Sequence, residues 1–486
     1  MGRQAVAQLF CYLLLVFSIP ATGDMRADLV FPDSLIEPEV RRYSYDPDTE
    51  AGVARDAAVD TGFLVSTLLE LLRQPAGSCR EVAVVEKTRE IFESLGKPLD
   101  IRITVDDLPE RFAKLSETDK TASYCNNGKT APASGNFIAY IPGNIPAPSW
   151  NLSFHLDTNQ SGFSGFRREG DILRPAAGTP LGADDKAGIA IAAELIRLIR
   201  DYRIPHGDIR IVGLVAEEDS AAGARLIDAS AFEGDIVVSI DGTDPDEIGR
   251  AAPTLYSGFI TVRTRTAHPA EIDKKRAVSA CAVGARILHE AGFRPDAHPP
   301  GHPGVVLHSY FMSCGTDNNR LTQKGEPVAD YQYNTVSPFW TSAWQMRNLE
   351  GAENARKLAD SIAATMRQVC AEAASGRTPV VCEITGTDEP ALTGYVVPED
   401  AAAIRVLKAG FAQTGTRPAT VTARQFGAFN GNLVKERFGE EMIILGTGAD
   451  QIHTIEETVS VSGMERVVRG VLAAMLESWR YRRIED

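Results

Sequence analysis

The chain has 486 residues, of which 44% are hydrophobic, so it can bury more than one large core. Its formal net charge of −15 argues against a nucleic-acid partner, because such a chain offers no basic face that could neutralise phosphates. The sequence contains no internal repeat, and beyond the N-terminus no apolar run is long enough to span a bilayer.

Residues 1–23 have the pattern of a signal peptide. Arg3 supplies a positive charge, Leu9 to Ile19 form a short apolar core, and Ala21-Thr22-Gly23 gives a small-residue cleavage pattern. An uncleaved membrane anchor is the alternative interpretation. We expect cleavage, export to the periplasm or the medium, and no stable membrane association of the mature chain.

Six cysteines follow the signal segment, at irregular spacing and without a CxxC pair: Cys79, Cys125, Cys281, Cys314, Cys370 and Cys382. This spacing indicates neither a zinc ribbon nor a redox motif. Export permits disulfides, with Cys370 and Cys382 the closest pair in sequence, and buried free thiols are the alternative.

The first half of the chain predicts an α/β domain. After an extended leader arm at 24–56, helices are predicted at 61–72 and about 80–95, and β-rich runs at 101–105 and 137–141. Strands at 152–156, 209–215 and 236–240 then alternate with a helix at 188–202 and a short Ala-rich helix. This alternation predicts βαβ units in a mostly parallel sheet covered by helices on both faces. In such sheets, ligands bind beyond the carboxyl ends of the strands.

The pattern changes after Pro253. Strands near 260–264, 305–311 and 340–346 and helices near 277–291 and 351–374 follow in β-α-β-β-α order, which is typical of a small α+β domain. The α/β pattern returns with a helix at 400–413, a strand at 442–445 and a helix at 463–481. We therefore predict an α/β domain in two parts, 57–252 and 378–486, with an inserted α+β domain at 253–377.

Acidic and histidine side chains follow several of the predicted strands. His155 and Asp157 are two residues apart on a strand, so their side chains leave the same face, and the carboxylate can orient the imidazole of a metal ligand. Asp184 and Asp185 begin an apolar helix. Read alone, the first pair is more simply a polar strand end, and the second is equally compatible with an acidic helix cap.

Glu217 and Glu218 follow an apolar strand. Adjacent carboxylates repel each other unless a cation compensates their charge. One glutamate would bind the metal while the other takes a proton from water, and a solvated helix start is the alternative interpretation. Together, the candidate ligands would hold two divalent ions, with Asp184 bridging them: His155, Asp184, Glu218, Asp241 and His453. Mixed imidazole and carboxylate ligands suit zinc best, with cobalt or manganese as alternatives.

Five strings carry a resemblance to a known family: HLDTN, LGADDKAG, VAEEDS, SIDGTDPDEIG and GTGADQIHTIEETV. In order and spacing they are similar to those of the peptidase T-like co-catalytic dizinc exopeptidases, a family that includes aminoacylases, desuccinylases and glutamate carboxypeptidases. The resemblance extends from about Phe63 to Leu476. The string LGADDKAG points to the peptidase T-like branch.

The resemblance implies a role for each matching residue. His155 and Asp241 would bind one metal ion, and Glu218 and His453 the other. Asp184 would bridge the ions and be joined to the next residue by a cis peptide bond.

Two further residues would act beside the metal ions. Asp157 would orient the His155 imidazole, and Glu217 would be the general base and then the general acid.

The resemblance also implies three substrate-binding residues. In the inserted lid domain, His268 matches a histidine that stabilises the oxyanion, in relatives often across a dimer, and Arg347 matches an arginine that holds a substrate carboxylate. Asn432 resembles a substrate-binding asparagine. The chain departs from the family pattern at Gly427-Ala428-Phe429-Asn430, where Gly-Gly-Ser/Thr-Asp is frequent, and at Asp450-Gln451 before the last histidine, which puts the substrate preference in doubt.

These observations predict a metal-dependent exopeptidase that hydrolyses short peptides, an aminopeptidase or tripeptidase of the peptidase T type. The alternatives are a carboxypeptidase, a dipeptidase or an N-acyl amino acid amidohydrolase, and a non-catalytic peptide-binding protein is less favoured. A homodimer formed through the lid domain is compatible with the resemblance.

Overall fold

A computed structural model describes most of the chain. Side chains and backbone are described for residues 58–97, 99–117, 120, 123–125, 130–159, 163–176, 178–265, 267–271, 277–294, 297–315, 336–374, 379–420 and 430–478. The backbone alone is described for 421, for 479–485, and for the antiparallel strands β1 (Ala27–Val30) and β2 (Arg42–Tyr45), which fall within the predicted leader arm. The predicted signal peptide, 1–23, lies outside the described residues.

The chain forms two compact units. The first contains the described residues up to Arg250, then Val397–Val421 and Leu433–Asp486, and the second contains Ala251–Val396 with the described part of 422–432. The division falls inside helix α14 (Asn430–Phe438). The second unit is therefore formed by one long and one short segment inserted into the sequence of the first.

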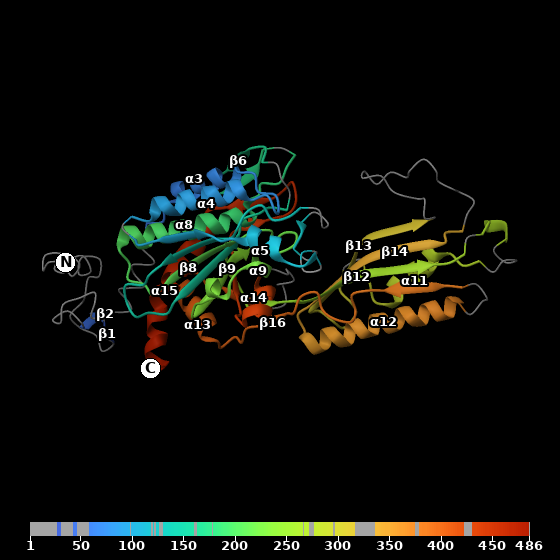
Figure 1. The fold of residues 1–486 in the computed structure, drawn as a ribbon. Coiled ribbons are helices and arrows are strands. Elements are labelled where there is room, and N and C mark those ends of the chain that lie inside the picture. Colours follow the sequence, from blue (N-terminus) through green and yellow to red (C-terminus); the bar gives the residue numbers. More distant parts are fainter. Residues whose placement is uncertain are drawn as a thin grey trace. The chain divides into compact units, whose positions relative to one another are not determined.

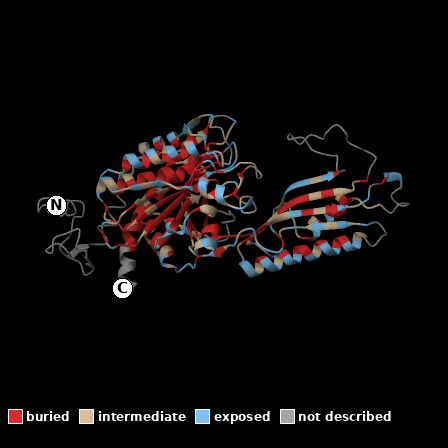
Figure 2. Cartoon of the chain, viewed as in Figure 1, coloured by how far each residue is buried: buried red, intermediate tan, exposed pale blue. Residues whose placement is uncertain are grey.

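An eight-stranded sheet organises the first unit (Figure 1). Its strands, in spatial order, are β17 (Ala419–Val421), β10 (Glu247–Gly249), β18 (Ile443–Gly446), β9 (Ile236–Gly242), β5 (Trp150–His155), β8 (Ile209–Leu214), β4 (Phe137–Ile141) and β3 (Arg102–Val105). The central neighbours β18, β9, β5 and β8 are parallel, and β3 and β4 are antiparallel additions at one edge. The parallel strands are almost entirely buried, as expected for strands that are covered on both faces (Figure 2).

Helices cover both faces of this sheet. On one face Phe137 of β4 packs on Phe92 of α4 (Val82–Leu95), with ring centroids 5.2 Å apart. On the other face Asn151 of β5 donates through Nδ2 to the backbone oxygen of Ala231 in the 3-10 helix η2 (Ala229–Phe232) at 2.7 Å. In Figure 1, α3 (Thr61–Leu72), α4 and α8 (Ala183–Tyr202) lie together on one side of the strands. The fold class predicted from the alternation is confirmed.

Helix α8 is the central helix of this layer, and almost all of its residues are buried. Its start is irregular, because Asp184 and Asp185 have non-helical backbone angles. A Cβ atom on Gly188 would lie 2.4 Å from the backbone oxygen of Ile240 on β9. Only glycine therefore allows the first regular turn of α8 to pack this closely against the sheet.

The first unit also contains a second, smaller sheet and further helices. Strands β6 (Phe166–Glu169), β7 (Ile172–Pro175), β20 (Thr458–Ser460) and β19 (Ala449–Asp450) form a small sheet. The other helices are α5 (Leu108–Lys114), α9 (Ala222–Leu226), α13 (Ala402–Gln413) and α15 (Val461–Glu485). Among the described residues, no helix combines the length and the apolar character needed to cross a membrane.

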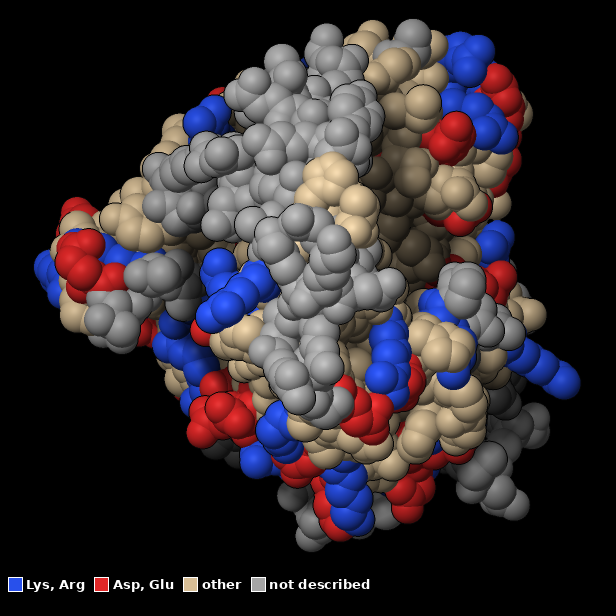
Figure 3. Space-filling model, turned by 90° about the vertical axis from the view of Figure 1, so that its right-hand side faces the viewer, with Lys and Arg blue, Asp and Glu red and all other residues tan. Residues whose placement is uncertain are grey.

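The second unit is an antiparallel sheet with helices packed on it. Its strand order is β13 (Val305–Gly315), β14 (Phe339–Asn348), β12 (Thr254–Arg263) and β15 (Val381–Ile384). Helices α11 (Ala280–Glu290) and α12 (Ala352–Ala374) form its apolar core together with the buried Trp340 and Trp344 of β14. The short 3-10 helix η3 (Pro269–Glu271) follows β12. On the face drawn in Figure 3, Lys and Arg side chains are interspersed with Asp and Glu side chains.

The chain leaves the first unit and returns to it at neighbouring points. At the boundary of the first unit, Val397 N donates to the backbone oxygen of Arg250 at 2.7 Å, and Arg250 Nη1 donates to Val397 O at 2.8 Å. Directly beyond these residues, β11 (Ala251–Ala252) and β16 (Tyr395–Val396) pair antiparallel. The two ends of the insertion therefore lie side by side.

The six cysteines after the predicted signal segment form three disulfides: Cys79–Cys125, Cys281–Cys314 and Cys370–Cys382. The first belongs to the first unit and the other two belong to the second. Of the two states that the sequence left open, the structure has the disulfides.

Candidate metal centre

The predicted metal ligands converge at the carboxyl edge of the parallel strands. His155 is the last residue of β5, Glu218 follows β8, and Asp241 stands near the end of β9. Asp184 begins α8, and His453 follows β19 in the loop after β18. Parallel strands point their carboxyl ends to one edge, so residues far apart in sequence become neighbours there.

Two groups of ligand atoms share Asp184: His155, Asp184 and Asp241 form one, and Asp184, Glu218 and His453 form the other. In the first group, His155 Nε2 lies 3.2 Å from Asp184 Oδ1 and 3.5 Å from Asp241 Oδ1. In the second, His453 Nε2 lies 3.2 Å from Asp184 Oδ2 and 3.0 Å from Glu218 Oε2. Each carboxylate oxygen of Asp184 therefore faces one group.

These distances fit divalent ions. An ion held tetrahedrally at about 2.0–2.1 Å from its ligands separates the ligand atoms by roughly 3.3 Å. The nitrogen–oxygen separations in both groups, 3.0–3.5 Å, lie around that value. A neutral imidazole nitrogen that carries one proton can donate to only one of the two oxygens near it, whereas a cation satisfies both. The residues present therefore fit two metal ions.

The electrostatics of the cluster also favour cations. Burial opposes a charge on His155, but the carboxylates around it outweigh this effect and raise the pKa of the imidazole well above its ordinary value. Hydrogen bonds to Asp184 and Glu218 raise the pKa of His453 to about 10. Burial raises the pKa of Asp241, and the nearby carboxylates of Asp184 and Glu218 add to this effect. Positive charge is thus stabilised at this edge of the sheet.

Backbone contacts hold His155 in place. Its Nδ1 lies 3.1 Å from the backbone oxygen of Asp157 and 3.4 Å from Oδ1 of the same residue. A proton on Nδ1 leaves the Nε2 lone pair facing Asp184 and Asp241, which is the tautomer that a metal ligand needs. Asp185 accepts from the backbone N–H of His155 at 3.1 Å, and its peptide bond to Asp184 is cis, as the resemblance implied.

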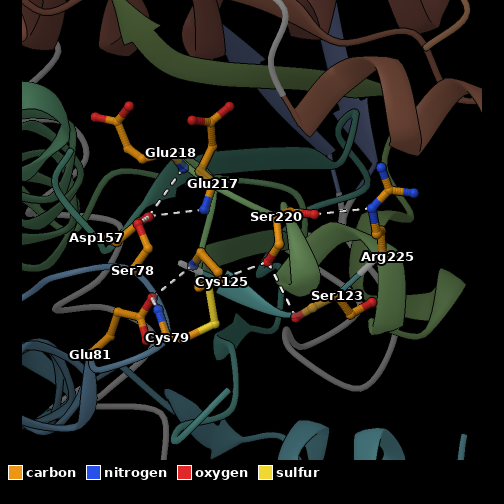
Figure 4. The surroundings of a disulfide bond; sticks show 11 residues. Ser78, Cys79, Glu81, Ser123, Cys125, Asp157, Glu217, Glu218, Ser220 and Arg225 are labelled. Atoms are coloured by element: carbon orange, nitrogen blue, oxygen red, sulfur yellow. Dashed lines mark hydrogen bonds between the residues drawn. A yellow bond between two sulfur atoms is a disulfide. The ribbon is translucent and has the colours of Figure 1, made fainter. Parts of the chain in front are cut away.

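Asp157 connects His155 with the predicted general base. Its Oδ1 accepts from Glu217 N at 3.0 Å, and its Oδ2 accepts from Glu218 N at 3.1 Å and from Ser78 Oγ at 2.6 Å. Figure 4 shows the side chains of Glu217 and Glu218 extending to the same side, away from Asp157. Because both glutamate amides are fixed by one carboxylate, the two side chains are oriented together.

The Glu217 carboxylate is half-buried and accepts no hydrogen bond from the described residues. Burial raises its pKa well above the ordinary value; the nearby charge of His155 opposes this shift, and the charges of Asp241 and Glu218 reinforce it. An unengaged carboxylate next to two ligand groups is chemically able to exchange protons with water.

Three residues at this edge were missed by the sequence analysis. Glu457, which is 1% exposed, accepts from Gly182 N at 2.7 Å and Asp184 N at 3.0 Å, although it lies inside a string that carries the resemblance. Lys186 is 2% exposed, and burial lowers the pKa of its ammonium to about 8 against the charges of surrounding carboxylates. Glu81 lies on the opposite side of the Glu217 backbone from the Glu217 carboxylate (Figure 4). The acid–lysine spacing in LGADDKAG could have indicated Lys186, but Glu81 resembles an ordinary helix start.

The three predicted substrate-binding residues lie in the second unit. His268 is exposed, and its Nδ1 accepts from Ala270 N at 3.2 Å. Arg347 on β14 donates to Gln345 Oε1 at 2.8 Å. Asn432 is buried, and its Nδ2 donates to the backbone oxygens of Pro253 and Thr393, both at 2.9 Å. Their substrate-binding roles stay predictions. Of the departing segment, 427–429 lie outside the described residues.

Comparisons with known proteins agree with this geometry. A model of peptidase family M20/M25/M40 matches residues 168–477. Protein YqjE of Bacillus subtilis is 23% identical over 355 residues, which are 72% of this chain and 86% of that protein. Peptidase T of Escherichia coli K12 is 35% identical over 112 residues, and the match spans only 27% of that enzyme and 23% of this chain.

Solved structures share the fold. A tripeptidase from Staphylococcus aureus Mu50 superposes with a TM-score of 0.69 at 19% identity, covering 87% of this chain and 99% of that one. Aminopeptidase PepT from Bacillus cereus gives 0.67 at 20% identity, with 86% and 99% covered. The Bacillus subtilis YXEP protein, described as a dinuclear metal-binding peptidase of the M20 family, gives 0.54 at 15% identity, with 87% and 99% covered.

The family model matches well over half of the chain and includes four of the five candidate ligands. The remaining ligand candidate, His155, precedes the matched region and joins the others in space. The chain belongs to peptidase family M20/M25/M40, and it is a metal-dependent peptidase.

Proposed function

We propose that this protein is an aminopeptidase that releases N-terminal residues from short peptides such as tripeptides, with Glu217 as the general base. The observation that carries the proposal is the pair of ligand groups that share Asp184, with the unengaged Glu217 carboxylate beside them. Similarity of fold to a tripeptidase and to aminopeptidase PepT supports the choice of substrate class.

Five residues would hold two divalent ions, most simply zinc: His155 and Asp241 on one side, Glu218 and His453 on the other, and Asp184 between them. When bound, the ions would supply Lewis-acid chemistry, activating water and polarising the carbonyl of the scissile bond. Glu217 would accept the proton that water loses and deliver it to the leaving amine. Asp157 would hold Glu217 in position through its backbone amide.

The three disulfides support a second part of the proposal, that the protein functions in an oxidising compartment outside the cytoplasm. Disulfides persist in such compartments and are rare in reducing ones. Fractionation of producing cells, with free thiols counted by mass after alkylation, tests this: full reactivity of all six cysteines in the native protein would contradict it.

The test of function is a product assay. Purified protein loaded with zinc, cobalt or manganese is offered tripeptides, dipeptides and N-acylated amino acids, and the products are identified by mass spectrometry. We expect release of the N-terminal residue from tripeptides. Release of C-terminal residues would show a carboxypeptidase, and cleavage restricted to acylated substrates would show an amidohydrolase.

Glu217→Gln removes the proton acceptor but keeps the size of the side chain. We expect it to lower kcat by about 10³-fold or more with little change in bound metal, because a general base contributes roughly 10²–10⁴-fold. Glu233→Gln is the matched control, since Glu233 lies on the surface in an ion pair with Arg210. An unchanged kcat in Glu217→Gln would exclude the proposed base.

A further inference from the structure

The residue before Glu217 has a strained backbone. Ala216 has φ of 58°, in the left-handed region that non-glycine residues rarely adopt. This conformation is unfavourable for a residue with a Cβ atom, because the Cβ comes too close to a backbone carbonyl oxygen. It turns the chain sharply at the end of β8, so the direction in which Glu217 and Glu218 leave the backbone depends on it.

One buried carboxyl group stabilises this turn. Glu81 is 0% exposed, and its Oε1 accepts from Ala216 N at 2.9 Å and from Cys79 N at 2.8 Å. Cys79 is also left-handed, with φ of 64°. Both strained residues therefore donate to the same oxygen. The other oxygen, Oε2, has no hydrogen-bond partner among the described residues. Within that part of the chain, the Glu81 side chain therefore accepts hydrogen bonds from these two amides alone.

The disulfide fixes the other end of this contact. Cys79 is bonded to Cys125, and both pack with Ala216 and Ala222 in a small buried cluster. Ser220, which follows the two glutamates, places its Oγ 3.4 Å from Cys125 Sγ. Figure 4 shows the disulfide and Glu81 on the opposite side of the Glu217 backbone from the glutamate carboxylates. The segment that carries the two glutamates therefore packs against the Cys79–Cys125 disulfide on the side opposite their carboxylates.

We propose that Glu81 is a positioning residue for peptide hydrolysis. Anchored through Cys79 to the Cys79–Cys125 disulfide, it holds Ala216 in its left-handed conformation and so aims Glu217 and Glu218. This inference rests on the proposed role of Glu217. The Asp157 carboxylate fixes the next two amides, so three successive backbone N–H groups, 216 to 218, each donate to the oxygen of an acidic side chain.

Three substitutions of Glu81 separate positioning from simple packing. Glu81→Gln keeps a carbonyl oxygen that can accept from both amides, and Glu81→Ala removes it. Glu81→Asp withdraws the oxygen by one methylene, and it provides the same test if the alanine variant does not fold. The readouts are kcat and KM on a tripeptide, bound metal by elemental mass spectrometry, and hydrogen exchange of the amides at 214–219.

We expect Glu81→Ala and Glu81→Asp to lower kcat by about 100-fold with KM changed less than about threefold, because a misplacement of 1 Å can cost this much. Exchange of the Ala216 amide should accelerate at least about tenfold, because this amide loses its acceptor, whereas the amides of Glu217 and Glu218 keep theirs on Asp157. Glu81→Gln should retain kcat within about threefold of the unsubstituted protein, since its carbonyl still accepts both hydrogen bonds.

Glu194→Ala is the matched control. Glu194 is also a fully buried glutamate of the first unit, and it accepts from Asp60 N at 2.7 Å and from Arg197 on α8. It should lower stability without changing kcat or exchange at 216–218. If Glu81→Ala behaves like Glu194→Ala in both readouts, Glu81 is merely structural and the proposal fails.

The disulfide is tested separately. Replacing Cys79 and Cys125 together by alanine should lower kcat by about tenfold, by the same misplacement argument, whereas replacing Cys370 and Cys382 together should not change it. Equal kcat in the two double variants would overturn the anchoring role of Cys79–Cys125. If no variant and no unsubstituted protein cleaves any peptide, the proposed function fails, and hydrogen exchange alone then decides whether Glu81 holds the segment.

Discussion

Asp157 Oδ1 accepts the backbone N–H of Glu217 at 3.0 Å, so the residue expected to orient His155 also orients the expected base. The predicted link from Asp157 was only to the imidazole. The structure adds a second link through the backbone, and the two candidate catalytic residues are therefore mechanically coupled. Several measurements can separate these contributions.

Asp157→Asn should lower kcat by about 10–100-fold, the range found for groups that support metal ligands. The asparagine side chain has one oxygen and one NH₂ group in place of two oxygens. One of the backbone N–H groups of Glu217 and Glu218 therefore loses its acceptor and faces another donor. Steady-state kinetics on a tripeptide provide the measurement. Ser78→Ala removes a donor to Asp157 while keeping both acceptors and should cost only a few-fold, consistent with about 1 kcal/mol for one hydrogen bond. A loss of kcat in Ser78→Ala that exceeds the loss in Asp157→Asn would contradict the proposed role of Asp157.

Removing either group of ligands should change metal content stepwise. The unsubstituted protein should bind two ions per chain, His155→Ala and His453→Ala about one each, and Asp184→Ala fewer than either, because Asp184 belongs to both groups. Dialysis against a chelator followed by titration with zinc or cobalt and elemental mass spectrometry gives the stoichiometry. Equal metal content in Asp184→Ala and the histidine variants would show that Asp184 is not shared.

Glu457→Ala should destabilise the metal-free protein by about 2–4 kcal/mol, because it leaves the partly buried N–H groups of Gly182 and Asp184 without their acceptor. Urea unfolding of the metal-free protein gives the free energy. Glu456→Ala changes an exposed neighbour and should alter the free energy by less than about 0.5 kcal/mol. Equal losses in the two variants would show that the contacts of Glu457 contribute nothing specific.

Glu81 should make stability depend on pH. Burial, reinforced by the charge of Asp157, raises the pKa of this carboxyl to about 8 in the folded protein, compared with about 4.3 in an unfolded chain. The folded state therefore retains a proton that the unfolded state has lost, so stability present below pH 4.3 decreases as pH rises towards 8. Glu81→Gln should flatten this decrease by up to about 1.4 kcal/mol per pH unit.

The measurement compares free energies of unfolding for metal-free Glu81→Gln and unsubstituted protein between pH 5 and pH 8. The difference between them should shift in favour of the variant as pH rises. A difference that is independent of pH would mean that Glu81 is ionised in the folded protein throughout this range.

Much of the fold could be predicted from periodicity. The helix at 61–72 and the β-rich run at 137–141 match α3 and β4 in both bounds, since apolar spacing is clear and polar residues or glycines flank it. The start of α8 was predicted five residues late, because Asp184 and Asp185 precede the regular turns. Strands β10, β17 and β19 were not predicted, since runs of two or three residues carry no period.

The candidate site divides in a similar way. The ligand candidates could be found because clustered carboxylates repel one another unless a cation compensates their charge. The structure brings all five candidates together. Glu81 could not be found, because its importance depends on left-handed angles at Cys79 and Ala216. Those angles come from tertiary contacts, and neither residue is a glycine that would have indicated them.

The hydrogen bonds between Arg250 and Val397 have a consequence for how this chain can be rebuilt. Because these residues are already neighbours, a turn of a few residues could join Arg250 to Val397 after excision of 251–396, the long segment of the second unit, and an unrelated domain could be grafted at the same place. Domain insertions are tolerated best where the chain ends lie close together, so this segment could be removed or replaced without separating the strands of the first unit.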